Sequence, residues 1–334
     1  MKLILLTAGG RAGSDFFHSL LDGHSQILQF PGYLRVDENL KNIFNTKDLK
    51  KKAKLFVRFY PEFFNSKINK FERWDKLGEK KNKHFKVNKD SFVKNFCKIS
   101  NGNISSYYKC LINLHLAYFI TRKKKIKNLK VLFVHTHLLN WTKEFIDFFS
   151  IKKVDILHTI RHPLSSISSP IKSWLSFDKG KHFFSKDLFY QMDTVVNCIY
   201  DLNKLGRLHI VNLERLHRQN TLLMKNFCKK FKIKYEKSLK KSTKNDLKWW
   251  ADRVSQKYIN GINKNFQVKI YDKHFYMRDL IFFQNLTNKI IKKYKYNLYY
   301  EEKNIVFNFL PMKCEKDVWK NTIKNLFSDR FRWK

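Results

Sequence analysis

The 334-residue sequence has scattered cysteines, few acidic residues and no long apolar run. Its five cysteines form no Cys-x-x-Cys pair, which argues against a disulfide framework and against a zinc knuckle. No segment approaches the ~18 apolar residues of a membrane-spanning helix. The apolar run after Lys2 is too short for a signal peptide. We therefore expect a soluble, cytoplasmic protein.

The shortage of acidic residues leaves a large excess of positive charge. The chain has 68 Lys and Arg against 28 Asp and Glu, a formal net charge of +40. Such a charge favours anionic partners: nucleic acid, an anionic membrane surface, or a phosphorylated or sulfated small molecule. A bias toward A/T-rich codons would also enrich Lys together with Asn, Ile and Phe. We expect no specific nucleic-acid partner, while peripheral contact with an anionic membrane stays open.

The apolar residues, 43% of the chain, are enough for a substantial core. Four strand-like apolar runs, beginning near Lys2, Lys130, Lys153 and Arg207, are each followed by a polar tip and an amphipathic helix pattern. This alternation predicts an α/β protein with a mostly parallel central sheet between layers of helices. Ligands of such proteins bind beyond the carboxyl ends of the strands, so the polar tips are the candidate sites.

We expect a single domain over residues 1–334 with two additions. Residues 37–127 have the pattern of a mainly helical insertion, and residues 236–334 that of a C-terminal cap. Two Lys/Asn-rich segments, 66–89 and 235–248, resemble disordered sequence.

The first strand tip is the stretch "TAGGRAGSDFF" at residues 7–17. It is similar to a phosphate-binding loop but lacks the Gly-Lys-Ser/Thr ending of a nucleotide triphosphatase. Its glycines allow backbone N–H groups to point inward, and a helix starting near Ser14 adds its N-terminal dipole. Arg11 adds a positive charge that can bind an anion bidentately. An ordinary strand-to-helix turn uses glycines in the same way, so both interpretations stay open.

A second tip, "TIRHPLSSISSP", has Arg161 at the strand end, Pro163 suited to the first helical position, and Ser169 eight residues after Arg161. Together with "GRAGSDFF", it resembles the two binding segments of the sulfotransferase family, which uses 3′-phosphoadenosine 5′-phosphosulfate (PAPS) as donor. The resemblance implies a P-loop-like fold in which Arg161 and Ser169 bind the 3′-phosphate. It also implies that the 5′-phosphosulfate is bound by Gly10, Arg11, Ala12, Gly13, Ser14 and Asp15.

Two positions depart from the family pattern. Asp15 stands where the family usually has a hydroxyl residue, which puts a carboxylate near a bound polyanion unless it turns away or caps the helix. Pro170 directly follows Ser169, so the helix there is either kinked or restarts with Ser169 as its cap.

A third tip, "VHTHLLNWTKEF", is similar to the Lys-Thr-His-Leu stretch that carries the general base of cytosolic sulfotransferases. By this resemblance His137 removes the acceptor proton, since an imidazole with a pKa near ~6.5 is a workable base, and His135 replaces the family's Lys. The residues alone also allow buried structural histidines, or a metal site with His158 or His162. Because no acidic or cysteine ligand of convincing spacing joins them, we predict no metal site and no metal requirement.

The resemblance further implies that "ADRVSQKYINGINKN" closes over the nucleotide, with Arg253 and Ser255 as cofactor-binding residues; a solvated loop is the alternative. The resulting hypothesis is a sulfotransferase that uses Arg11 and His137 to transfer a sulfuryl group from PAPS to a hydroxyl acceptor, a carbohydrate or glycolipid among them. The alternatives are a P-loop kinase or NTPase-like nucleotide-binding protein and a basic nucleic-acid-binding protein.

Overall fold

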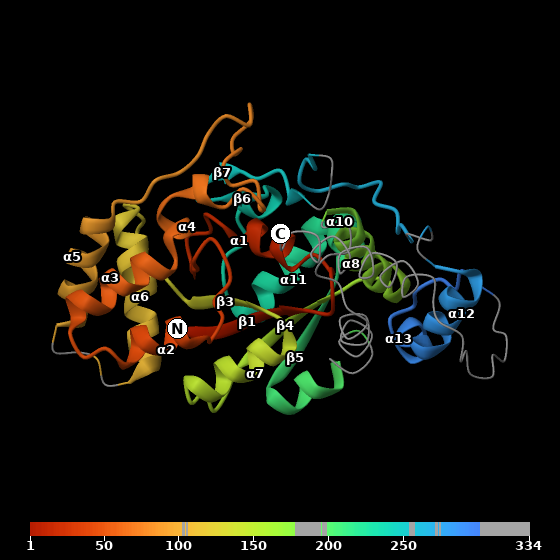
Figure 1. The fold of residues 1–334 in the computed structure, drawn as a ribbon, viewed down its shortest axis with the longest axis horizontal. Coiled ribbons are helices and arrows are strands. Elements are labelled where there is room, and N and C mark those ends of the chain that lie inside the picture. Colours follow the sequence, from red (N-terminus) through yellow and green to blue (C-terminus); the bar gives the residue numbers. More distant parts are fainter. Residues whose placement is uncertain are drawn as a thin grey trace, which may run out of the picture.

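The centre of the computed structural model is a five-stranded sheet in the order β2-β3-β1-β4-β5 (Figure 1). Every pairing within it is parallel, which confirms the predicted α/β fold with a mostly parallel sheet. The structure describes residues 1–101, 104, 106–177, 195, 199–253, 258–270, 273 and 275–300. The five strands are β1 (Lys2–Ala8), β2 (Ile27–Leu28), β3 (Val131–His137), β4 (Asp155–Ile160) and β5 (Arg207–Asn212).

Helices cover both faces of this sheet, with α7 on one side and α1 and α11 on the other (Figure 1). Ile4 and Leu6 of β1 pack in the core cluster of α1 and α11, whereas Leu3 and Leu5 pack in the cluster that contains α7. Burial on both faces explains why β1 is a continuous apolar run. The helices that follow the strands are α1 (Ser14–Leu21), α7 (Leu139–Phe148), α8 (Pro163–Phe177), α10 (Leu213–Arg218) and α11 (Asn220–Phe231).

A group of short helices lies between β2 and β3 in sequence and at one end of the sheet (Figure 1). Four of them begin at polar residues that accept a hydrogen bond from a backbone N–H three residues on, namely Asp37, Asp48, Asn88 and Ser106. The group consists of α2 (Glu38–Asn45), α3 (Leu49–Phe59), α4 (Pro61–Phe64), the 3-10 helix η1 (Ser66–Ile68), α5 (Lys89–Ser100) and α6 (Tyr107–Thr121).

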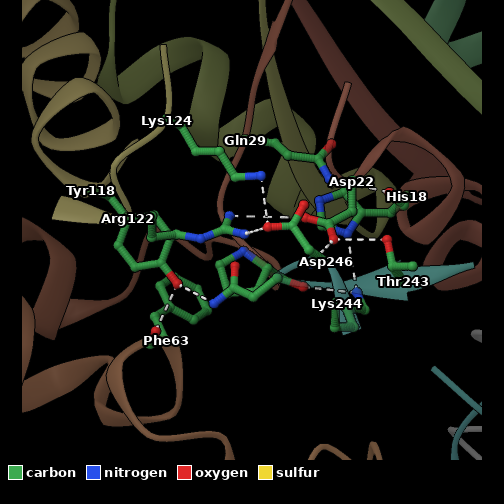
Figure 2. A network of polar contacts seen from close by, with 12 residues as sticks. His18, Asp22, Gln29, Phe63, Tyr118, Arg122, Lys124, Thr243, Lys244 and Asp246 are labelled. Atoms are coloured by element: carbon green, nitrogen blue, oxygen red, sulfur yellow. Dashed lines mark hydrogen bonds and ion pairs between the residues drawn. The ribbon is translucent and has the colours of Figure 1, made fainter. Parts of the chain in front are cut away.

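The Lys/Asn-rich segment 235–248 is ordered, contrary to its disorder-like composition. Asp22, at the end of α1, accepts hydrogen bonds from the Thr243 hydroxyl at 2.8 Å and from the Asp246 backbone at 2.7 Å (Figure 2). Arg122, just after α6, forms an ion pair with Asp246 at 2.9 Å. These contacts hold a small hairpin between α1 and α6. The segment contains the 3-10 helix η2 (Lys237–Lys240) and the strands β6 (Thr243–Lys244) and β7 (Leu247–Lys248).

The last described helices, α12 (Met277–Leu286) and α13 (Asn288–Lys293), follow a long segment without α-helices or strands in its described parts. Leu280 and Phe283 of α12 pack on Ile167 of α8. Helix α8 begins at Pro163, as predicted, and continues through Pro170, so it does not restart at Ser169. Within the described part of the chain, no helix has the length and apolar character needed to cross a membrane.

Candidate functional site

The strand order brings the three predicted binding tips to one edge of the sheet. β1 lies between β3 and β4, so their carboxyl ends are neighbours. The glycine-rich loop follows β1, His137 ends β3, and Arg161 follows the last residue of β4. Groups that lie far apart in the sequence therefore share one site, at the edge where α/β proteins bind ligands.

The loop after β1 ends at Gly13, which is the N-cap of α1 and has a left-handed φ of 81°. A Cβ at this position would lie 2.5 Å from Cδ1 of Leu213, so both the backbone angle and the close packing require glycine. No side chain of the described residues caps α1 here. The first N–H groups of α1 are therefore available to an anion.

Two arginines flank this loop. A guanidinium nitrogen (Nη1) of Arg161 lies 3.5 Å from the carbonyl oxygen of Arg11. Nη2 of Arg11 lies 2.5 Å from a carboxylate oxygen of Asp252, a partner that the sequence analysis missed. The segment predicted to close over the nucleotide thus does reach the loop, but through an acidic residue. Its carboxylate neutralises Arg11 in this structure.

The other predicted cofactor residues lie less directly against the loop. Ser169 is buried within α8, and the α8 serine that hydrogen-bonds to the loop is Ser166, which donates to the Gly9 carbonyl at 2.5 Å. The side chain of Arg253 is exposed, while its backbone N–H donates to the Phe71 carbonyl at 2.9 Å. Ser255 lies outside the described residues.

Asp15 turns toward the histidines at the end of β3. Its carboxylate oxygens lie 3.6 Å from Nδ1 of His135 and 4.0 Å from Nδ1 of His137. The two histidines also face each other, with 3.4 Å between Nδ1 of His137 and Nε2 of His135. The expectation that no acidic residue joins these histidines is therefore wrong. Together the three groups have a composition and spacing able to hold a metal ion.

A local irregularity in β3 shapes this cluster. Leu6 of β1 pairs with His135 and Thr7 pairs with His137, so Thr136 is an extra residue on β3. Such a bulge bends the strand and re-aims its side chains. His137 itself has a left-handed φ of 69°, and the rings of His135 and His137 come to 5.3 Å between centroids.

Two aromatic rings lie next to the ring of His137. The ring of Tyr33 lies 5.4 Å from that of His137 at an interplanar angle of 25°, and the ring of Trp141 lies 5.9 Å away. The His137 side chain is 34% exposed, so incoming molecules can reach it. His162 is one of the two further histidines that the sequence offered as metal ligands, and it lies instead within hydrogen-bond distance of the Asn297 carbonyl at 3.0 Å.

The electrostatics of the cluster favour neutral histidines and an ionised carboxylate. Burial lowers the pKa of His135 to about 3 and also lowers the pKa of His137, against the opposing effect of Asp15. Burial alone would raise the pKa of Asp15, but the two imidazoles, followed by Lys244 and Arg11, outweigh it and hold that pKa below its ordinary value. His137 is then unprotonated at neutral pH, as a general base must be.

A buried lysine that sequence reasoning missed lies beside this cluster. Nζ of Lys244 donates to the Pro31 carbonyl at 2.7 Å and lies 3.2 Å from Nδ1 of His18 (Figure 2). It also lies 5.4 Å from the ring centroid of Trp74 and 5.2 Å from that of Trp249. Burial lowers the pKa of Lys244. Its Lys-rich sequence context concealed it, because such a composition is typical of exposed segments.

Comparisons with known proteins give only distant similarities. No family model matches the chain, and no curated protein matches it. Among solved structures, the chain is similar to the sulfotransferase domain from the curacin biosynthetic pathway, with a TM-score of 0.43 and 16% identity over 89% of this chain and 98% of that one. It is also similar to the sulfotransferase domain from the Synechococcus PCC 7002 olefin synthase, with a TM-score of 0.41 and 12% identity over 89% and 96% of the two chains. Similarities at this level do not assign a family, so the function has to be inferred from the residues of the site.

Proposed function

We propose that the chain is a sulfotransferase that transfers a sulfuryl group from PAPS to a hydroxyl acceptor. The observation that carries the proposal is the shared edge of β1, β3 and β4, where Arg11, Arg161 and His137 meet around one uncapped helix N-terminus. A polyanionic donor and a neutral base have to be adjacent in this reaction, and the site holds groups suited to both.

The residues of the loop fit the phosphosulfate end of such a donor. The N-terminal N–H groups of α1 are free of a side-chain cap from the described residues, and they suit an anion. The loop lacks the Lys-Ser/Thr pair that holds a γ-phosphate and Mg²⁺ in triphosphatases, which favours a donor without a third phosphate. Arg11 serves the donor once its guanidinium exchanges Asp252 for phosphosulfate oxygens.

The transfer itself needs positioning, charge stabilisation and one proton transfer. The acceptor oxygen forms a bond to sulfur, and the bond from sulfur to the bridging oxygen of the 5′-phosphate breaks in line with it. Arg11 stabilises the negative charge that develops on the departing 5′-phosphate. The acceptor proton passes to Nε2 of His137.

His135 and Asp15 orient that base. When Nδ1–H of His137 donates toward Nε2 of His135, at 3.4 Å, the lone pair of the His137 imidazole lies on Nε2. Nδ1–H of His135 then points at the Asp15 carboxylate, at 3.6 Å. Asp15 thus acts on the imidazoles and not on the bound polyanion. The rings of Tyr33 and Trp141 lie next to the base and offer apolar contact to a sugar or an aromatic acceptor.

Binding of the product nucleotide tests the proposal without knowledge of the acceptor. We expect 3′-phosphoadenosine 5′-phosphate to raise the melting temperature in EDTA more than ATP with Mg²⁺ does. Arg161→Ala should remove the shift, whereas Arg58→Ala, which deletes an exposed arginine of α3, should keep it. A larger shift with ATP and Mg²⁺ would instead favour a kinase or NTPase-like protein. Absence of any nucleotide-induced shift would refute the proposal.

Two further variants test the proposed base. His137→Ala should abolish sulfuryl transfer from PAPS and leave binding of the bisphosphate nearly unchanged. His84→Ala removes a histidine of the helical insertion and serves as the control. Normal turnover by the His137 variant would exclude this residue from the mechanism.

A further inference from the structure

We propose that Asp15, His135 and His137 form a binding site for a divalent first-row transition-metal ion such as Zn²⁺. The three residues come from the first turn of α1 and the end of β3. One candidate ligand atom from each of them lies within 4.8 Å of the other two. Two imidazoles and one carboxylate are a donor set that such ions bind readily.

The three ligand atoms lie somewhat farther apart than in a loaded site. A zinc ion bonded at about 2.0–2.2 Å to each ligand sets neighbouring ligand atoms roughly 3.3–3.6 Å apart in tetrahedral geometry. In this structure Nδ1 of His135 lies 3.6 Å and Nδ1 of His137 lies 4.0 Å from the Asp15 carboxylate, and one ligand atom from each residue lies within 4.8 Å of the other two. Side-chain rotations that bring these atoms closer together would complete the site.

His135 supplies an independent sign that the cluster lacks a partner. Its side chain is fully buried, and its Nδ1 has no hydrogen-bond partner among the described residues. The atom points at Asp15 from 3.6 Å, too far for a hydrogen bond. Buried polar atoms are almost always satisfied in folded proteins, and a bound ion would satisfy this one.

The protonation states suit metal binding. Metal ligands have to be neutral imidazoles and ionised carboxylates, because bound protons compete with the ion. Burial lowers the pKa of His135 and of His137, and nearby positive groups lower the pKa of Asp15.

Two nearby cations, Arg11 and Lys244, oppose the ion, and both are engaged by other groups. Arg11 forms an ion pair with Asp252. Lys244 has a pKa lowered by burial and donates to the Pro31 carbonyl.

The cluster is also open to entry. The side chains of Asp15 and His137 are 25% and 34% exposed, while His135 closes the inner side. Three protein ligands with an open side is the arrangement of sites that keep a position for water or substrate.

Binding at this site has a consequence for His137. A metal bond at Nδ1 leaves the imidazole proton on Nε2, so the ring cannot accept a proton there. An occupied site and the base role under "Proposed function" therefore exclude each other. The metal site itself does not depend on that proposed function, since its test uses neither donor nor acceptor.

Calorimetric titration of the full chain, stripped of metal with EDTA and dialysed, measures binding of Zn²⁺. Co²⁺ is the spectroscopic probe, because a visible absorption band reports its coordination by nitrogen and oxygen. We expect one ion per chain. Asp15→Asn and His137→Ala should each weaken binding by about tenfold or more. Both side chains are partly exposed, so these variants should fold, which circular dichroism and melting curves can check.

Two control variants guard against adventitious binding. His84→Ala removes a partly exposed histidine of the helical insertion, and Cys97→Ser removes a partly exposed free thiol. Both should bind one ion as the unmodified chain does. The proposal would be overturned if the unmodified chain showed no saturable binding, or if the Asp15 and His137 variants bound the ion as tightly as the unmodified chain does. Loss of binding on replacing Cys97 would also overturn it.

Discussion

The carboxylate of Asp252 lies 2.5 Å from the guanidinium of Arg11, at the mouth of the glycine-rich loop. Under the proposed function, a bound phosphosulfate would need the same guanidinium, so the carboxylate would compete with it. The segment that carries Asp252 therefore places a negative charge against the arginine of the loop.

We predict that Asp252→Asn binds 3′-phosphoadenosine 5′-phosphate more tightly. A partly buried ion pair contributes about 1 kcal/mol. If the ligand no longer has to break this pair, its affinity should rise about fivefold. Calorimetric titration with the bisphosphate at low salt measures this affinity. Asp246→Asn, which removes a carboxylate paired with Arg122 in the hairpin, should leave the affinity unchanged. An unchanged or weaker affinity in the Asp252 variant would show that this carboxylate does not compete with the ligand.

Gly13→Ala should destabilise the fold and the loop together. The left-handed backbone costs about 1–2 kcal/mol with any Cβ, and the new Cβ would meet Leu213 at 2.5 Å. Gly261→Ala is the matched control, because its φ is also positive but its nearest neighbour lies 3.8 Å away. Urea unfolding should show a larger loss for Gly13→Ala. Equal losses would mean that the contact with Leu213 relaxes freely.

Stability should fall in mild acid because of buried histidines. Burial lowers the pKa of His115, His135 and His158 to about 3 in the folded chain, from an ordinary value of 6.5. Between these values the unfolded chain binds more protons than the folded one, so the free energy of unfolding rises with pH. The stabilisation is present at neutral pH and is lost as the pH falls from about 6.5 toward 3. Urea midpoints across this range measure it, and His115→Gln should reduce the slope.

Zn²⁺ should inhibit sulfuryl transfer if both proposals hold. Occupation of Nδ1 of His137 removes the base, so activity should fall as the site fills and return on addition of EDTA. Mg²⁺, which prefers oxygen ligands, should not inhibit. Faster transfer with Zn²⁺ would show that the ion takes part in the reaction, against the competition argued above.

Much of the fold was predictable because its signals are local. Apolar runs followed by amphipathic patterns predicted β1, β3, β4 and β5 with their helices, and the structure confirms a parallel sheet. Proline at the first helical position likewise predicted the start of α8 at Pro163. Each of these features depends on residues a few positions apart.

The partners of the site residues were not predictable in this way. Arg11 and Asp252 are 241 positions apart, and no spacing rule links them. The bulge at Thr136 also breaks the simple alternation of β3, so the direction of His137 could not be read from strand periodicity.

The sequence by itself determined the class of fold and the polar tips at the ends of its strands, because short-range periodicity and turn chemistry are written in neighbouring residues. Only the tertiary structure decided that Asp15 faces two histidines, that Asp252 neutralises Arg11, and that Lys244 is buried beside them. The physical reason is that charge pairing and burial depend on which strands and helices become neighbours in space, and the sheet order sets those neighbours.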